Sequence, residues 1–157
     1  MRSGIRLGID VGKARIGVAR SDLHGMLASP VETVPRDLEG AGHLPRLLEL
    51  IREHEAIEVL VGLPLAMSGR ETASTADARL VAEQLADASP APVRLVDERL
   101  STVTASAQLR ASGRRPSRSR DRIDQLAAVV ILQNALEAER TTGRAPGSPV
   151  RGEEPSS

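Results

Sequence analysis

The chain has 157 residues, of which 21 are basic and 21 acidic, so its formal net charge is zero. This is the length of one domain, which is enough to bury a hydrophobic core. The absence of cysteine excludes disulfide bonds and thiolate zinc sites. The absence of aromatic residues requires an aliphatic core and excludes base stacking on aromatic rings. Because no apolar run could span a bilayer and no secretory pattern opens the chain, we expect a cytoplasmic protein with no membrane partner.

The charge is unevenly distributed along the chain. Between residues 110 and 122, six arginines face one aspartate, so this stretch carries +5 and the rest of the chain −5. Two interpretations stay open: a solvated loop, or a clamp on the phosphate backbone of a nucleic acid. The second makes Arg114, Arg115 and Arg118 candidate nucleic-acid contacts.

The first half of the chain predicts strands followed by a helix. Apolar runs at 7–11 and 16–19, separated by glycines, predict a β-hairpin. Residues 26–35 predict a third extended segment, whose two prolines suit an edge strand. From 38 to 54, leucine and isoleucine recur at helical spacing, which predicts an amphipathic helix.

In the second half, strands and helices alternate. We expect strands at 57–61 and 93–97, a glycine-bounded loop at 62–71, a helix from Thr72, a helix at 102–112, and a last helix capped by Ser117 or Ser119. Alternation of this kind indicates parallel strands with right-handed crossovers. The prediction is a mixed five-stranded α/β sheet flanked by helices, formed by a domain at 1–140, with a disordered tail at 141–157 that has few apolar residues.

Asp10 stands alone among apolar residues of the first predicted strand. A buried carboxylate is costly unless a positive charge compensates it, and Lys13, Arg15 or a metal ion could do so. The alternative is a turn-forming aspartate that hydrogen-bonds its own backbone. Glu98 follows the fifth strand and Asp124 lies near the start of the last helix, so all three carboxylates can reach the rim at the carboxyl ends of the strands.

Three carboxylates at one rim would repel by about 4 kcal/mol per pair at ~4 Å, and divalent cations remove that penalty. Oxygen ligands without cysteine or paired histidine favour Mg²⁺ or Mn²⁺ over zinc. Two such ions about 4 Å apart catalyse phosphodiester hydrolysis. The pattern therefore predicts a metal-dependent nuclease in which Lys13 or an arginine neutralises the phosphate.

Four motifs in register resemble the YqgF/RuvX family: Gly8-Ile-Asp-Val-Gly12 with Ile16-Gly-Val-Ala19, Val61-Gly-Leu-Pro-Leu65, Asp97-Glu-Arg-Leu-Ser-Thr102, and Ile123-Asp with Ala127-Ala-Val-Val-Ile-Leu132. The resemblance covers residues 4 to about 139. It implies a ribonuclease H-like fold, with candidate activities of pre-16S ribosomal RNA nuclease or Holliday junction resolvase. By resemblance, the family's acidic residues fall on Asp10, Glu98 and Asp124, with Asp121 a weaker alternative for the third.

This chain departs from the family at two loops. Gly12-Lys-Ala14 stands where the family often has Gly-Thr-Lys, and Ala66-Met-Ser-Gly69 stands where it often has Asn-Met-Asp-Gly. Neither departure touches the three acids. We expect structured nucleic acid to contact Lys13, Arg99 and the arginine-rich stretch.

Three functions remain in view. Processing of the 5′ end of pre-16S rRNA is the main prediction. Resolution of Holliday junctions is the first alternative, and it requires two sites facing opposite strands, hence a homodimer. The second alternative is a non-catalytic RNA-binding factor in ribosome assembly. A nucleotide-binding enzyme fits poorly, since the chain has no glycine-rich phosphate loop.

Overall fold

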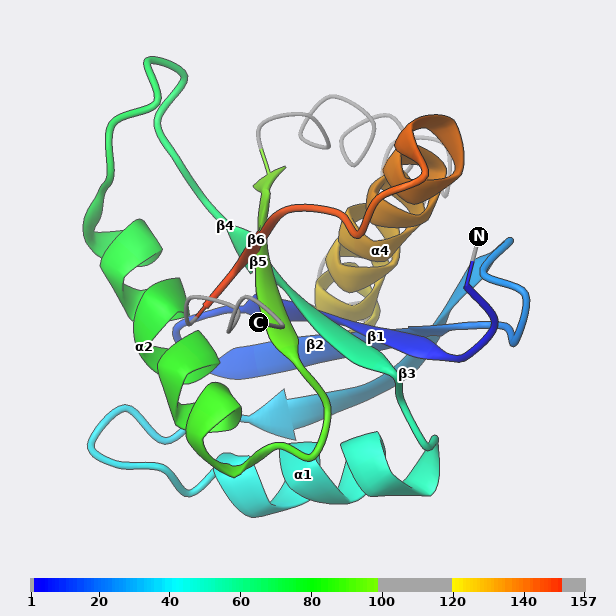
Figure 1. Ribbon diagram of the computed structural model, residues 1–157. Coiled ribbons are helices and arrows are strands. Elements are labelled where there is room, and N and C mark those ends of the chain that lie inside the picture. Colours follow the sequence, from blue (N-terminus) through cyan, green and yellow to red (C-terminus); the bar gives the residue numbers. More distant parts are fainter. Residues whose placement is uncertain (1, 99–119, 151–157) are drawn as a thin grey trace.

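The protein, seen here as a computed structural model that describes residues 2–98 and 120–150, is built on a six-stranded sheet (Figure 1). The strand order is β3-β2-β1-β4-β5-β6. In chain order, the elements are β1 (Arg6–Val11), β2 (Arg15–Ser21), β3 (Ala28–Pro35), α1 (Leu44–Glu53), β4 (Glu58–Leu63), α2 (Ala73–Ala88), β5 (Val93–Asp97), α4 (Arg120–Thr142) and β6 (Ser148–Pro149).

The sheet is mixed, as the sequence predicts. The first three strands pair antiparallel, whereas β4 runs parallel to β1 and β5 parallel to β4. The proline-containing β3 forms one edge of the sheet. An edge strand tolerates proline, because one side of the strand needs no backbone N–H for pairing. The predicted number of five strands is wrong, because β6 pairs antiparallel with β5 at the opposite edge.

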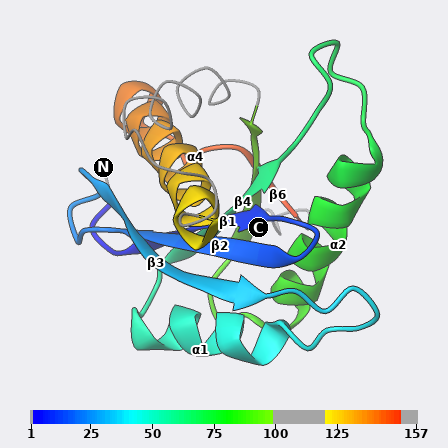
Figure 2. The same cartoon turned by 180° about the vertical axis from the view of Figure 1, so that it is seen from behind.

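Helices cover both faces of the sheet. α1 and α2 lie on one face and α4 crosses the other, as the two opposite views show (Figures 1 and 2). Side chains alternate along a strand, so Leu7 and Ile9 of β1 enter the larger core under α1 and α2. The alternate positions Gly8 and Asp10 then face α4. This alternation places the lone acidic residue of β1 on the α4 side.

α1 begins six residues later than its apolar spacing suggests. The carboxylate of Asp37 accepts hydrogen bonds from the backbone N–H groups of Glu39 and Gly42, which closes a turn before the helix. By contrast, α2 begins directly after Thr72, as the sequence predicts. The side chain of Thr72 accepts a hydrogen bond from the backbone N–H of Thr75 and so caps the helix.

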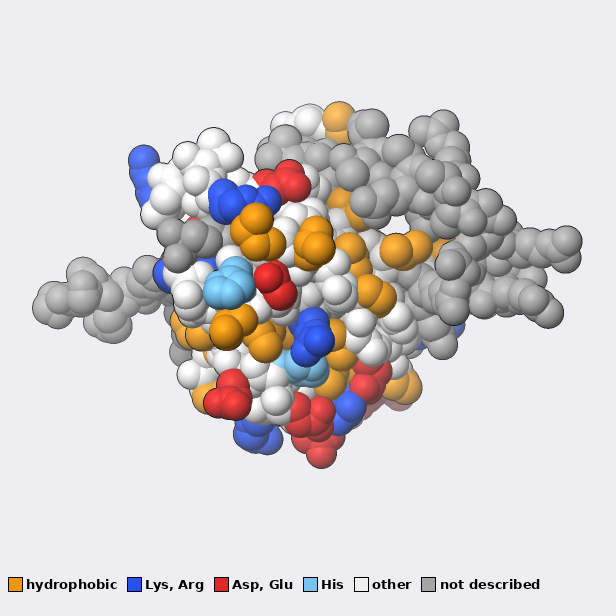
Figure 3. Space-filling view, turned by 90° about the vertical axis from the view of Figure 1, so that its right-hand side faces the viewer, with side chains coloured by type: hydrophobic (Ala, Val, Ile, Leu, Met, Phe, Trp, Pro, Cys, Tyr) orange, Lys and Arg blue, Asp and Glu red, His pale blue; other side chains and the backbone are white. Residues whose placement is uncertain are grey.

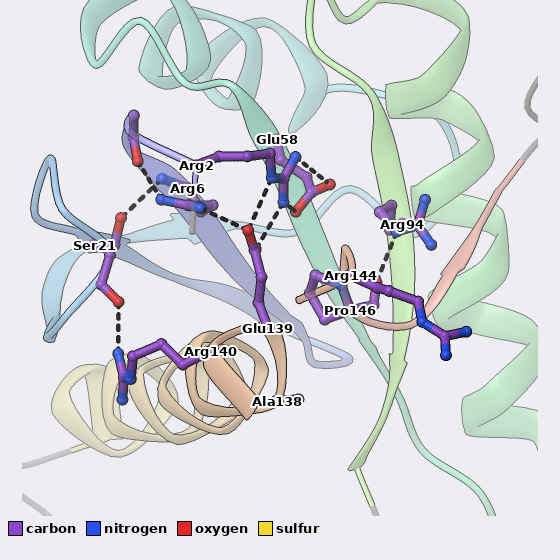
Figure 4. A network of polar contacts seen from close by, with 12 residues as sticks. Arg2, Arg6, Ser21, Glu58, Arg94, Ala138, Glu139, Arg140, Arg144 and Pro146 are labelled. Carbon is purple, nitrogen blue, oxygen red and sulfur yellow. Dashed lines mark hydrogen bonds and ion pairs between the residues drawn. The ribbon is translucent and has the colours of Figure 1, made fainter. Parts of the chain in front are cut away.

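The expectation of a disordered tail is wrong for residues 141–150. Arg94 of β5 is almost fully buried, and its guanidinium donates to the carbonyl oxygens of Pro146 and Gly147 (Figure 4 shows the first of these contacts). The N–H of Val150 then donates to the carbonyl of Val93. Backbone hydrogen bonds to an open sheet edge, which need no apolar composition, hold this segment.

A buried ionic cluster joins β1, β4 and the end of α4. Arg6 and Glu139 pair at 3.1 Å while almost fully buried, and Arg2 bonds both Glu139 and Glu58 (Figure 4). With two arginines and two glutamates, the charges balance. The cluster fixes the C-terminal half of α4 against the sheet, which in turn sets the position of its N-terminal half.

The predicted helix at 102–112 and the caps at Ser117 and Ser119 lie outside the described residues. Within the described part of the chain, no helix has the length and apolar content needed to cross a membrane.

Candidate active site

Two glycines allow the acidic residues to approach one another. Gly17 of β2 pairs with Asp10 of β1, and a side chain at position 17 would overlap the backbone carbonyl of Asp124 in α4. The helix therefore lies directly on the hairpin beside Asp10. At Gly62 of β4, an added Cβ would lie 2.8 Å from Oε2 of Glu98. The missing side chain leaves the space that the carboxylate of Glu98 occupies.

Burial and mutual repulsion set the charge states of two of these acids. Burial, and then the negative charge of Asp124, raise the pKa of Asp10 to about 6. Burial, followed by the charges of Asp10 and Asp97, raises the pKa of Glu98 to about 7. Asp10 thus interacts electrostatically with both of the other predicted acids. Buried carboxylates with raised pKa values are typical of functional sites.

Asp124 is held differently. Its Oδ2 accepts a hydrogen bond from Nε of Arg15 at 2.9 Å, and both side chains are partly exposed. The sequence names Arg15 as a possible partner of Asp10, but its ion pair is with Asp124. In this arrangement, no three acidic or histidine side chains among residues 2–98 and 120–150 are grouped closely enough to share a metal ion.

The donor chemistry of the site nevertheless fits a divalent cation. Asp10 and Glu98 supply carboxylate oxygens, the ligands that Mg²⁺ and Mn²⁺ prefer. Burial raises the energy of their ionised forms, and a bound cation would lower it. Asp124 could supply a third oxygen once its pairing with Arg15 is released. The side chain of Asp121, the alternative third acid, lies outside the described part of the structure.

Lys13 is exposed on the turn between β1 and β2. With Leu38 and Leu80 it lines an open groove of about 500 Å³ beside α2. The backbone of this turn is fixed by the buried Arg36, which donates to the carbonyl of Gly12 and pairs with Asp77. The sequence analysis missed Arg36, since nothing local to it indicates a partner 41 residues away.

The remaining predicted nucleic-acid contacts, Arg99, Arg114, Arg115 and Arg118, lie outside the described residues. The face in Figure 3 shows basic, acidic and hydrophobic side chains intermixed over its described residues. That mixture does not form the basic surface expected of a phosphate-backbone contact.

Comparison with known proteins relates this architecture to nucleases. A family model described as RuvX, Holliday junction resolvase, matches residues 4–138. A protein of Clavibacter michiganensis subsp. michiganensis named as a candidate pre-16S rRNA nuclease is 60% identical over 148 residues, covering 94% of this chain and 92% of that protein. A Streptomyces coelicolor protein of the same name is 55% identical over 152 residues, covering 96% of this chain and 90% of that protein.

Among solved structures, T. thermophilus RuvC in complex with a Holliday junction substrate aligns with a TM-score of 0.54 at 21% identity, covering 93% of this chain and 99% of that chain. A second Thermus thermophilus RuvC structure aligns with a TM-score of 0.53 at 21% identity, covering 92% of this chain and 99% of that chain. At this identity the likeness shows the fold alone, which is ribonuclease H-like as the resemblance implied.

Proposed function

Because the chain belongs to the RuvX family of Holliday junction resolvases and is a nuclease, we propose that it processes the 5′ end of pre-16S rRNA by metal-dependent hydrolysis. Relatives 52% to 60% identical over most of the chain carry the pre-16S rRNA nuclease name. That shared name favours RNA over branched DNA as the substrate of this chain. The single observation that carries the hydrolytic site is the pair of partly buried carboxylates, Asp10 and Glu98, whose pKa values are raised, on the face covered by α4.

In this proposal Asp10, Glu98 and Asp124 hold the divalent cation, Mg²⁺ or Mn²⁺. Bound divalent cations activate water and stabilise the leaving oxygen in phosphodiester hydrolysis. Asp10 and Glu98 contribute fixed oxygens from the ends of β1 and β5, which are neighbours of the central β4. Because Asp10 lies in β1 and Glu98 directly follows β5, the sheet places both carboxylates, and they need little reorganisation to bind a cation.

Basic residues then position the nucleic acid. Lys13 lies on the turn that follows Asp10, so its ammonium can neutralise a phosphate near the carboxylates. Contacts to the flanking backbone are assigned to the arginines of the stretch that the sequence singled out, Arg99, Arg114, Arg115 and Arg118. Such contacts bind structured nucleic acid through its shape and charge, which suits a chain without aromatic residues.

The family description favours one alternative, resolution of branched DNA junctions. That reaction requires a homodimer with two active sites facing opposite strands. Processing of an RNA end requires only one site. We propose a cytoplasmic location for the RNA reaction, with a nuclease domain that extends through β6.

The test offers the purified protein, with Mg²⁺ or Mn²⁺, a precursor rRNA 5′ fragment and a four-way DNA junction. We expect RNA cleavage that Asp10→Asn, Glu98→Gln and Asp124→Asn each abolish while the protein stays folded. Glu83→Gln, an exposed change on α2, is the control and should cleave normally. Cleavage of the junction alone, with a dimeric mass in solution, would replace the RNA proposal with its alternative. Full activity in any acidic variant would remove that residue from the site.

A further inference from the structure

The turn that carries Lys13 is held on both sides by one arginine. Arg36 directly follows β3, and its backbone N–H donates to the carbonyl of Ala14 at 2.9 Å. Its Nη1 donates to the carbonyl of Gly12 at 3.0 Å. These two carbonyls belong to the residues before and after Lys13. The turn lies beside α2 in both opposite views (Figures 1 and 2).

The conformation of this turn needs support from outside the hairpin. The N–H of Gly12 donates to the carbonyl of Arg15 at 2.8 Å, so only Lys13 and Ala14 connect the bonded pair. Two-residue hairpin loops usually adopt turns with positive φ, which suit the twist of the strands. Neither Lys13 nor Ala14 has a positive φ. The hydrogen bonds from Arg36 therefore fix a turn whose own geometry does not favour a tight hairpin.

Arg36 is in turn fixed by α2. Its Nη1 and Nη2 donate to the two carboxylate oxygens of Asp77 at 2.8 and 2.5 Å. A bidentate pair of this kind sets the plane of the guanidinium as well as its position. The Arg36 side chain is 2% exposed, so little solvent competes for these bonds. Because Asp77 balances the charge of Arg36, the pair is a neutral support for the turn.

The charge of Lys13 remains accessible. Lys13 is exposed and forms no ion pair with another residue in the described part of the chain. The hydrogen bond from Arg36, followed by the charges of Arg36 and Lys13, holds the pKa of Asp77 below its usual value, so this carboxylate stays ionised. Lys13 follows Asp10 by three residues, which keeps their Cα atoms within about 11 Å. From a fixed turn, the long lysine side chain can reach a phosphate near the carboxylates.

We propose that Arg36 is a positioning residue that acts through Lys13, holding the turn so that the ammonium meets a phosphate of nucleic acid bound at Asp10. This inference rests on the proposed function, which gives Lys13 its phosphate contact. A role in stability alone leaves the Nε of Arg36 unexplained, because this buried donor has no hydrogen-bond partner in the described part of the chain. A lysine on an unfixed turn would have to order that turn on binding, which weakens the contact.

Two other roles for Arg36 predict different results. If Arg36 only ties α2 to the hairpin, its loss lowers stability, and any loss of activity adds to that of a Lys13 variant. If its positive charge alone attracts nucleic acid, lysine should replace it, and removing the nearby acid Asp77 should raise activity. In a positioning role, lysine does not replace Arg36, removing Asp77 lowers activity, and neither loss occurs once Lys13 is absent.

The experiment measures kcat/KM for cleavage of the precursor rRNA 5′ fragment by the full chain with Mg²⁺. The variants are Lys13→Gln, Arg36→Lys and Asp77→Ala, and the last two are also made in the Lys13→Gln background. We expect Lys13→Gln to lower kcat/KM roughly ten-fold, and Arg36→Lys and Asp77→Ala roughly three- to ten-fold. In the Lys13→Gln background, neither should lower it further by more than about two-fold.

The salt dependence of kcat/KM gives the second readout. Loss of one phosphate contact should reduce the slope of log kcat/KM against log salt concentration by about one in Lys13→Gln. Arg36→Lys should show a similarly reduced slope although it keeps its charge, which a merely structural role would not produce. Two variants are controls and should match the wild type: Arg46→Gln removes an ion-paired arginine of α1, and Glu83→Ala removes an exposed acid of α2.

Wild-type kcat/KM in Arg36→Lys, or unchanged or increased kcat/KM in Asp77→Ala, overturns the proposal. Losses that add in full to that of Lys13→Gln also overturn it. If Lys13→Gln has no effect, the phosphate contact and this inference both fail, while the carboxylate site stands. If the wild type does not cleave the RNA fragment, the proposed function fails and this inference with it. Thermal unfolding verifies that each variant is folded, and Asp77→Ala carries the test alone if Arg36→Lys does not fold.

Discussion

Replacing Asp10 by asparagine should make the metal-free protein more stable at neutral and alkaline pH. Asparagine keeps the shape of the side chain and removes its buried charge. Burial raises the pKa of Asp10 to about 6, against about 3.9 for an unfolded aspartate. Folding therefore favours the protonated carboxyl, and the wild type loses stability as pH rises from about 4 through 6.

The size of the effect follows from the shift. About two pKa units at 1.36 kcal/mol each give a cost of about 3 kcal/mol above pH 7 and about 1.5 kcal/mol at pH 5. Asp10→Asn removes this cost. For a chain of this length, 3 kcal/mol corresponds to an increase in Tm of about 6–12 °C.

Urea unfolding of the wild type and Asp10→Asn in EDTA, at pH 5 and at pH 8, measures the difference in unfolding free energy at each pH. Glu83→Gln, which removes an exposed carboxylate on α2, is the control and should show little difference between the two pH values. Adding Mn²⁺ at pH 8 should reverse the order by stabilising the wild type more than Asp10→Asn. If Asp10→Asn is no more stable than the wild type at pH 8 in EDTA, Asp10 does not carry an uncompensated buried charge, and the reasoning is refuted.

Three further changes test the fold and the substrate contacts. Gly17→Ala should cost about 1–3 kcal/mol of unfolding free energy and reduce cleavage, because its Cβ would overlap the carbonyl of Asp124; Gly40→Ala, which would meet only a side chain, is the control. Glu139→Gln should cost about 3–5 kcal/mol in urea unfolding, since it leaves Arg6 buried without its ion pair. The hydrogen bond from Arg2 lowers the pKa of Glu139 to about 2, so the wild-type advantage should disappear as pH falls from about 4 to 2. Replacing Arg114, Arg115 and Arg118 together by glutamine should weaken nucleic-acid binding and flatten its salt dependence, and unchanged affinity at low salt would contradict the clamp.

Local patterns in the sequence predicted most of the sheet and its order of elements. The fifth strand, at 93–97, matches β5 residue for residue, and α2 begins next to Thr72, as the sequence predicts. These features depend on apolar spacing and on capping groups a few residues apart, which a sequence displays directly. The tail at 141–150 was mispredicted because its place depends on a distant arginine and on an open edge of β5.

The sequence by itself determined that Asp10 is an acid set into a buried strand, and that Glu98 follows a parallel strand of the same sheet. Strand periodicity is local, so the chain displays which residues share a face. Only the tertiary structure decided that α4 lies against Gly17 and that Asp124 pairs with Arg15 rather than facing the other acids freely. The partner of a charged side chain is selected by close packing between elements more than a hundred residues apart, and no local pattern records that choice.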